Sequence, residues 1–390
     1  MKNYRTVETL LDSISETHDF NLSNYIFLNT SDISKGVILN KKIFKKDELK
    51  GQAKKKILKD DILLSEIRPK NKRYAYVNFK DTDNYVVSTK LMVLRNKTAD
   101  VLTKYIYYLV TNQKTLNYLQ SLAENRIGSF PQITYDILKK LRFNIPNEKI
   151  QKETIVSLEK FDDLIDRNNQ IIKSLQNLIN TIFIYWYLQF NFPNKESKPY
   201  QLSSGNLVFN EEIQKKIPYG WEIKTLGSIL SDEVYSKKIP SNNFLSEGLI
   251  PVIDQDDELI SGFTNDKASI IKVTDNPYIV FGDHSRRLKL INFDFARGAD
   301  GTQLIYSNNP RMPQRILYTL LNLIELGDYG YARHFKFLKK IKLIIPDTNT
   351  SEKLEKILKN YYNSIDFYNN QNLYLNNLKD RLFSFISSKN

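Results

Sequence analysis

Residues 283–285 read Asp-His-Ser, and these are the side-chain types that a serine hydrolase uses for acyl transfer. A catalytic triad needs its members brought together in space beside an oxyanion hole, and three neighbours in the sequence supply neither feature. The cations that follow, Arg286, Arg287 and Lys289, are better explained as a basic strand edge that meets a nucleic-acid duplex. The segment therefore predicts binding rather than hydrolysis.

The sequence lacks the full signatures of DNA methyltransferases, nucleases and ATP-driven motors. Residues 275–278, Asp-Asn-Pro-Tyr, approach an amino-methyltransferase motif but lack its second proline, and no convincing glycine-rich cofactor turn precedes them. Residues 346–347, Pro-Asp, are not followed by the acidic-x-Lys triplet of a nuclease, and the pattern G-x-x-x-x-G-K-[ST] does not occur. A catalytic methyltransferase or nuclease polypeptide is thus the weaker alternative, and such chemistry would belong to partners.

A second basic cluster lies in the N-terminal half of the chain. Arg68, Lys70, Lys72 and Arg73 surround Pro69, and tyrosines follow them. An ordinary solvated loop is one interpretation of this cluster. Pro69 would stiffen a loop between two strands, however, and a rigid basic loop beside aromatic rings suits contact with phosphates and bases. We therefore predict that these four cations bind DNA.

Five further positions are candidate contacts to a phosphate backbone. Gly128 and Ser129 offer backbone N–H groups without bulky side chains, although a plain turn explains them equally well. Gly301 follows an aspartate, a pair that favours a tight turn through which the backbone can approach DNA closely. Arg333 and Lys336 flank a His-Phe pair and are better candidates for phosphate contact than that histidine.

The composition favours a chain of several domains with an anionic partner. A chain of 390 residues is too long for a single hydrophobic core. The formal charge of +13 and the pI near 9.3 favour nucleic acid as the partner, although membrane lipid and polyphosphate remain alternatives. Without cysteine, disulfides and thiolate metal sites are excluded, which suits a reducing cytoplasm. Residues 1–17 resemble no signal peptide, and the apolar run at residues 181–190 is too short to cross a bilayer. We expect a cytoplasmic protein without a membrane span.

An internal repeat organises the chain. Residues 138–146 recur as residues 338–346, and the same offset, 338 minus 138 or 200 residues, matches positions in the segments that follow without a gap. In each copy a proline precedes an apolar stripe with alternating spacings of four and three, the pattern of a coiled-coil seam. Two core helices of a bundle are the alternative explanation. The predicted seam includes Phe161, Ile165, Ile172 and Leu175 in the first copy, and Leu358, Ile365 and Leu375 in the second.

The repeat predicts the order head, helix, head, helix. We expect a first head at residues 1–145, a central helical spacer at 146–190, a linker with the second head at 191–345, and a C-terminal helical spacer at 346–390. The predicted fold class is α+β, with mixed α/β heads and two long helices that form an antiparallel coiled coil with a pseudo-twofold repeat.

Local patterns predict strands and helices within each head. The first head has strand patterns at residues 25–28, 73–77 and 85–88 and a helical pattern at 100–122. The second has strand patterns at 249–253, 278–281 and 288–295 and a helical pattern at 312–326. The polar, proline-broken residues 192–199 are predicted to be a surface linker.

Several segments, taken in their order along the chain, resemble the specificity subunits of Type I restriction-modification enzymes. Together with the helical repeat, the resemblance covers nearly the whole chain. The first head lacks the Pro-x-Gly-Trp and Gly-Ala-Asp-Gly elements of the second, so we expect two different subtypes of recognition domain. The segments that carry the resemblance are residues 217–222, 226–227, 279–286, 298–302 and 333–339 in the second head, and residues 65–73 and 128–133 in the first.

The resemblance implies a non-catalytic DNA-binding subunit with two target-recognition domains, each of which reads a short half-site of double-stranded DNA. It also implies a helical spacer that acts as a ruler for a bipartite target and that contacts two modification subunits, alongside restriction subunits. S-adenosylmethionine, ATP and Mg²⁺ are expected on those partners, and no cofactor in this chain. A structural coiled-coil adaptor is a further alternative, but it does not explain two large basic heads.

Overall fold

The computed structural model describes residues 3–49, 51–124, 131–231, 236–256, 258–299, 301–324 and 334–389. The chain divides into two compact units. Unit 1 comprises Met1–Arg167 with Gln371–Asn390, and unit 2 comprises Asn168–Asn370. None of the helices in the described ranges combines the length and apolar character needed to cross a membrane.

A strand near the start of each head pairs with the last strand of that head. In unit 1, β1 (Tyr4–Thr6) runs antiparallel to β12 (Arg142–Asn144). In unit 2, β15 (Glu222–Thr225) runs antiparallel to β23 (Lys342–Ile345). Each pairing joins segments that are far apart in the sequence and so closes the head on itself.

Backbone hydrogen bonds continue each closing pair in the same way. Val7 N donates to Leu141 O at 2.9 Å, and Leu226 N donates to Ile341 O at 2.9 Å. The N-terminal segment of the first head is therefore the counterpart of the segment that follows Trp221 in the second, although the two differ in sequence.

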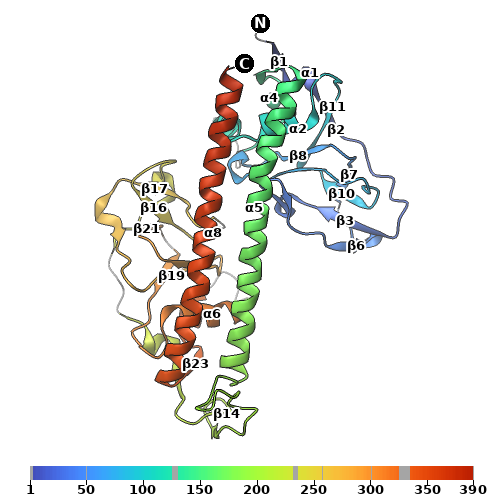
Figure 1. Cartoon of the computed structure of the whole chain (residues 1–390). Coiled ribbons are helices and arrows are strands. Elements are labelled where there is room, and N and C mark those ends of the chain that lie inside the picture. Colours follow the sequence, from blue (N-terminus) through green and yellow to red (C-terminus); the bar gives the residue numbers. More distant parts are fainter. Residues whose placement is uncertain are drawn as a thin grey trace. The chain divides into compact units, whose positions relative to one another are not determined.

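Unit 1 contains two four-stranded sheets (Figure 1). In the sheet of order β6-β3-β10-β7, strands β3 and β10 are parallel and the other neighbours are antiparallel. The sheet of order β2-β11-β8-β9 is antiparallel throughout. Their bounds are β2 (Leu11–Ile14), β3 (Asn24–Leu28), β6 (Ile43–Lys45), β7 (Ala53–Lys56), β8 (Ile62–Ser65), β9 (Tyr74–Tyr76), β10 (Tyr85–Ser88) and β11 (Leu91–Asn96).

The head of unit 2 repeats this topology. In the sheet of order β17-β16-β21-β18, strands β16 and β21 are parallel and the outer pairs are antiparallel, as in the first sheet of unit 1. The antiparallel sheet β20-β19-β22 corresponds to β9-β8-β11. Two heads of different sequence thus share one scaffold. The bounds are β16 (Ile250–Ile253), β17 (Gly262–Thr264), β18 (Ile270–Ile271), β19 (Tyr278–Gly282), β20 (Leu288–Ile291), β21 (Phe295–Arg297) and β22 (Thr302–Ile305).

The long helix predicted in the first head is two helices, α2 (Thr103–Thr111) and α3 (Gln113–Glu124). Asn112 divides them. Its Nδ2 donates to Leu109 O at 2.6 Å, and its Oδ1 accepts from Thr115 N at 3.0 Å. One amide side chain therefore ends the first helix and begins the second, which helical periodicity alone does not reveal.

Most other local predictions are confirmed, with two corrections. The strand predicted at residues 288–295 is wrong as a single element, because β20 and β21 belong to different sheets. The predicted linker 192–199 is exposed at residues 195–198, but Phe192 is buried and stacks on Trp221 with ring centroids 5.3 Å apart. The remaining elements are α1 (Val7–Leu10), β4 (Ile33–Ser34), β5 (Val37–Ile38), α4 (Tyr135–Leu138), β13 (Leu207–Asn210), β14 (Lys215–Pro218), α6 (Gln314–Leu323) and α7 (His334–Leu338).

Each long helix begins directly after the proline that ends the repeated segment. In α5 (Glu148–Phe183), Asn147 Oδ1 accepts from Ile150 N at 3.0 Å. In α8 (Thr348–Lys389), Asp347 Oδ1 accepts from Thr350 N at 3.0 Å. Asn147 and Asp347 are one repeat offset apart, and each satisfies an N–H group that the helix itself leaves unpaired.

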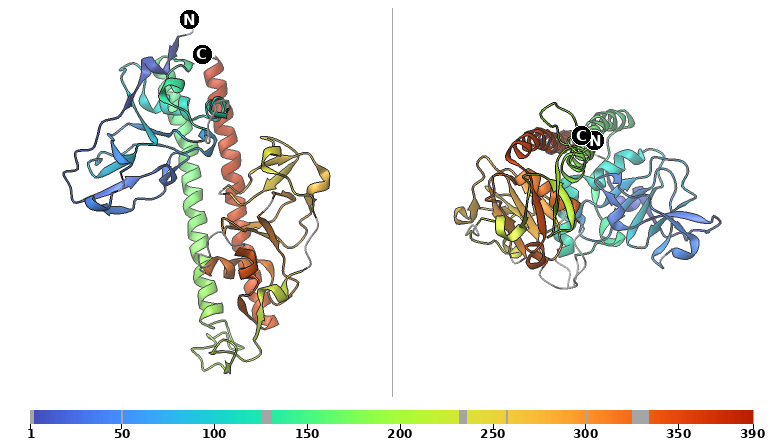
Figure 2. Two further views of the ribbon diagram at one scale, coloured as in Figure 1. Left: turned by 180° about the vertical axis from the view of Figure 1, so that it is seen from behind. Right: turned by 90° about the horizontal axis from the view of Figure 1, so that it is seen from below.

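Within each unit the two long helices lie side by side and run antiparallel (Figures 1 and 2). In unit 1, the Lys379 ammonium near the end of α8 pairs with the Asp162 carboxylate near the start of α5. Phe161, Ile165 and Leu375 of the predicted seam are half-buried there. The predicted fold class is confirmed. The seam residues of unit 2 pack in one apolar cluster, which includes Ile172, Leu175, Leu358 and Ile365.

Replacement of Leu358 by alanine is expected to lower the free energy of unfolding by about 2–5 kcal/mol, because this side chain is fully buried and the helices cannot collapse into the space. Leu373→Ala on the same helix is the matched control, since Leu373 is 59% exposed and its loss should cost less than about 0.5 kcal/mol. Urea unfolding followed by circular dichroism measures both. Equal losses would contradict the placement of Leu358 in the seam.

Candidate nucleic-acid interface

The first basic loop, residues 66–73, connects β8 to β9 and holds the four cations predicted to bind DNA. Arg68 and Lys70 are exposed, whereas Lys72 is half-buried. Pro69 is buried at the start of a 3₁₀ turn, with Arg68 and Lys72 on either side at φ of 46° and 53°. Two left-handed residues beside a buried proline give the loop a fixed shape.

Backbone hydrogen bonds hold the first basic loop against the rest of unit 1. Arg68 N donates to Pro131 O at 2.9 Å, and Lys70 N donates to Gln120 Oε1 at 3.1 Å. The Lys70 side chain therefore extends from an anchored backbone. A cation held in this way loses less conformational freedom when it meets a phosphate than one on a mobile loop.

One exposed cation beside this loop was missed by the sequence analysis. Lys35 N donates to Lys72 O at 2.8 Å, and Gly36 N donates to Tyr74 O at 3.0 Å. The turn between β4 and β5 thus adds its Lys35 side chain to the first basic loop. No local motif marks Lys35, because only the tertiary pairing brings residues 35 and 72 together.

The second basic loop, residues 283–287, connects β19 to β20 and so occupies the position that corresponds to the first. Arg287 is exposed, and Arg286 is half-buried at φ 58°. Arg286 N donates to Gly282 O at 2.7 Å, which closes the turn. The predicted cations Arg286 and Arg287 therefore lie at the tip of a hairpin.

Asp283 begins the second basic loop as a buried structural acceptor. Its Oδ1 accepts from Phe335 N at 2.7 Å, and its own N–H donates to Gly301 O at 2.6 Å. This carboxylate fixes the loop to the start of α7. The interpretation of residues 283–285 as a binding segment rather than a triad agrees with that role.

Lys289 differs from the other predicted DNA contacts because its side chain is buried, at 8% exposed. Its Nζ donates to Asp254 O at 2.6 Å, to Asp256 Oδ1 at 3.2 Å and to Glu258 O. Burial lowers the pKa of the Lys289 ammonium, and the nearby carboxylates oppose that shift. An ammonium with three donors and three internal acceptors has none left for a phosphate, so Lys289 is not retained as a DNA contact.

Gly301 lies in a tight turn at φ +93°. A Cβ atom there would come within 2.9 Å of His284 Cδ2 and 3.1 Å of Gln255 Nε2. The turn thus brings its backbone close to the second basic loop, and only glycine fits the position without strain.

The remaining predicted contacts are only partly placed. Lys336 is exposed on α7. Gly128, Ser129 and Arg333 lie outside the described residues. Their assignment as phosphate contacts therefore stays a prediction.

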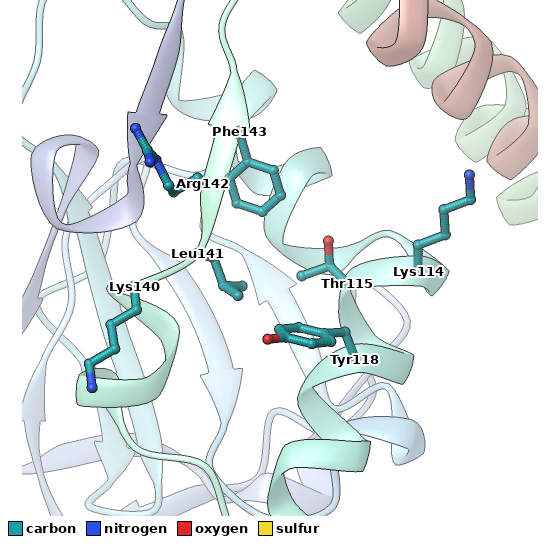
Figure 3. Close-up of a pocket in the computed structure, with 7 residues that line it drawn as sticks. All are labelled: Lys114, Thr115, Tyr118, Lys140, Leu141, Arg142 and Phe143. Atoms are coloured by element: carbon teal, nitrogen blue, oxygen red, sulfur yellow. The ribbon is translucent and has the colours of Figure 1, made fainter.

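A hollow of about 350 Å³ in unit 1 gathers further positive charge (Figure 3). The ring of Tyr118 on α3 lies opposite Leu141, and Lys114, Lys140 and Arg142 stand around them. None of its seven lining residues is acidic. Among the described residues, no cluster of histidine and carboxylate side chains is arranged to hold a metal ion.

Residues 15–177 match the model of the family described as Type I restriction modification DNA specificity domain. The chain is 41% identical over 202 residues to the specificity subunit of the Type I restriction enzyme HindI from Haemophilus influenzae, a match to 52% of this chain and 43% of that protein. It is 29% identical over 154 residues to the MjaIX specificity subunit from Methanocaldococcus jannaschii, a match to 39% of this chain and 33% of that protein. The chain thus matches less than half the length of these relatives, and the resemblance predicted from the motifs is confirmed.

Two solved structures are similar over nearly their whole length. The HsdS subunit from Thermoanaerobacter tengcongensis has 15% identity and a TM-score of 0.41, with 99% of this chain and 96% of that chain covered. The S subunit of a Type I system from M. genitalium has 16% identity and a TM-score of 0.46, again with 99% and 96% covered.

Replacement of Gly301 by alanine is expected to destabilise unit 2 by about 1–3 kcal/mol, because the residue is left-handed and a Cβ meets His284. Gly51→Ala is the control, since no atom lies within 4 Å of a Cβ there. Thermal unfolding measures both variants. If the Gly301→Ala protein has the same melting temperature as the wild type, the turn accommodates the Cβ without a loss of stability.

Proposed function

Because residues 15–177 match the family model of Type I restriction modification DNA specificity domains, we propose that the whole chain is the DNA-reading specificity subunit of such a system. The observation that carries the proposal is the shared topology of the two heads. Each head presents a basic loop at the same connection, after β8 in one and after β19 in the other. One scaffold with different side chains suits two different half-sites of one target.

The exposed and half-buried cations of the two basic loops supply the phosphate contacts in this proposal. In the first head these are Arg68, Lys70 and Lys72 with the neighbouring Lys35, and the formal charge of +13 supports the same partner. Arg286 and Arg287 have this role in the second head. Gly128, Ser129, Gly301, Arg333 and Lys336 are retained as further predicted contacts, whereas Arg73 donates to Ser31 O and Ile33 O.

Catalysis belongs to partner subunits in this proposal. Modification subunits would bring S-adenosylmethionine for methyl transfer, and restriction subunits would bring ATP and Mg²⁺ for DNA cleavage. The chain would work with them in the cytoplasm. Its own contribution is to bind the target and to select its sequence.

The long helices set the spacing of the two half-sites. At a rise of ~1.5 Å per residue, the 36 residues of α5 span about 54 Å, which exceeds one DNA turn of ~34 Å. Both helices contribute to both units, with α5 divided at residues 167 and 168 and α8 at residues 370 and 371. A rod of this length supports a bipartite target with a fixed gap.

A partly exposed apolar row on α5 and the helical turn that follows it supports the docking of modification subunits. Ile171 and Leu178 on α5, and Tyr185 just after it, are spaced by seven residues and are 38%, 40% and 36% exposed. A seven-residue spacing keeps side chains on one face of a helix. This row lies beside the seam and suits packing against a helix of a partner.

Co-expression of this chain with a Type I modification subunit is expected to methylate host DNA at one bipartite motif. Sequencing of methylated bases measures the motif, and omission of this chain should abolish it. Exchange of one head should change only one half of the motif. A folded, partner-bound complex that neither binds nor methylates DNA would overturn the proposal and favour the structural adaptor.

Lys70→Ala and Arg287→Ala are each expected to weaken binding to all duplexes and to reduce the slope of log K against log salt by about 0.9, the value for one lost phosphate contact. Lys195→Ala is the control, because it removes the same charge from an exposed turn outside both basic loops. Fluorescence anisotropy across a salt series measures the slopes. Slopes that fall equally in all three variants would refute a specific role for the loops.

A further inference from the structure

A second loop lies beside the basic loop in each head. In unit 1 it is the first companion loop, residues 29–34, which follows β3. In unit 2 it is the second companion loop, described at residues 254–256 and 258, which follows β16. Strands β3 and β16 hold the same place in the shared topology, so the two loops correspond. Neither loop was singled out in the sequence.

In the first head, a cation at the end of the basic loop holds the companion loop. The Arg73 guanidinium donates to Ser31 O and to Ile33 O, each at 3.3 Å. Two main-chain carbonyls of the companion loop are therefore tied to the strand that leaves the basic loop.

In the second head, Lys289 holds the second companion loop through hydrogen bonds to its main-chain carbonyls. It donates to the carbonyl oxygens of Asp254 and Glu258 and to the Asp256 carboxylate. Arg73 immediately precedes β9 and Lys289 lies in β20, and β9 and β20 correspond. Two heads of different sequence thus each use a cation near the start of the corresponding strand to hold the main chain of the corresponding loop.

Gln255 is the side chain that the second companion loop places against the basic loop. Its Oε1 accepts from His284 N at 3.2 Å. Because the His284 N–H is a donor, this bond identifies the amide atom beside it as the oxygen and the other as the Nε2 donor. Its Nε2 has no hydrogen-bond partner among the described residues. Gly301 leaves room for it, since a Cβ there would lie 3.1 Å from that nitrogen.

The negative charge of the second companion loop makes this loop unsuited to contact with phosphate groups. Asp254, Asp256 and Glu258 flank Gln255, and Asp256 is half exposed. Carboxylates repel the DNA backbone but accept from the amino groups of bases in the major groove. The acidic companion loop is therefore suited to contact the base edges, while Arg286 and Arg287 of the neighbouring basic loop contact the phosphates.

We propose that Gln255 is a base-reading residue of the second head, held in position by Lys289, and that it recognises an adenine. An oriented glutamine amide donates from Nε2 to adenine N7, while the second lone pair of Oε1 accepts from the adenine amino group. Lys289 is a positioning residue in this arrangement and touches no DNA. The inference rests on the proposed DNA-binding function and names one contact within it.

Gln255→Ala is the direct test, in the full chain complexed with a modification subunit. The preference for adenine at one position of the half-site read by the second head should fall roughly 10- to 100-fold, because a bidentate base contact is lost. The salt slope should stay at the wild-type value. Gln255→Glu should shift that position towards cytosine, since a carboxylate only accepts. An unchanged motif in both variants would overturn the inference.

Lys289→Met tests the positioning role against Arg287→Ala. Lys289→Met should relax the same position of the motif with no change in salt slope, whereas Arg287→Ala should lower the slope by about 0.9 and leave the motif intact. A lower slope with an intact motif for Lys289→Met would make Lys289 a phosphate contact and refute its positioning role. If that variant fails to fold, Gln255→Ala, at a half-buried position, still decides the base contact.

The two proposals fail in different ways. If the wild-type complex methylates no motif at all, the proposed function is wrong. If the wild-type complex methylates a bipartite motif and the Gln255 variants methylate the same motif with unchanged selectivity, only the role of Gln255 is wrong.

Discussion

Backbone pairing between an early strand and the last strand of each head is the constraint on which the rest of the structure depends. Tyr4 pairs with Asn144 in unit 1, and Glu222 pairs with Ile345 in unit 2. This closure sets the edge at which the chain leaves each head. A proline follows there, and a capped long helix begins directly after it.

Each unit is completed by the end of a helix that began elsewhere in the chain. Phe183 near the end of α5 is buried in the core of unit 2, and Phe383 near the end of α8 is buried in the core of unit 1. They are one repeat offset apart. In unit 2 the Tyr187 hydroxyl also donates to Ile344 O on the closing strand. The repeated helices are therefore structural parts of both heads, and their apolar residues serve the seam and the head cores together.

The cations of the two heads have two distinct physical roles. Those on loops, such as Lys70 and Arg287, keep their charge at the surface, where it can replace counterions on a phosphate. Arg73 and Lys289 instead use their N–H groups to hold main-chain carbonyls of a second loop. Cations in the two heads thus serve two purposes: those at the surface carry positive charge, and Arg73 and Lys289 fix the position of the companion loops.

The sequence by itself determined the repeat, the two helices, their apolar seam and the two basic runs that carry the cations. These features depend on local spacing, because a period near 3.5 marks a helical seam and a proline marks its start. Tertiary structure alone decided which of the cations are exposed and which are buried. Arg287 and Lys289 are two residues apart in one basic run, yet only Lys289 is buried, because the loop that follows β16 supplies its three acceptors from residues 31 to 35 positions earlier. A local sequence pattern does not reveal contacts between residues so far apart in the chain.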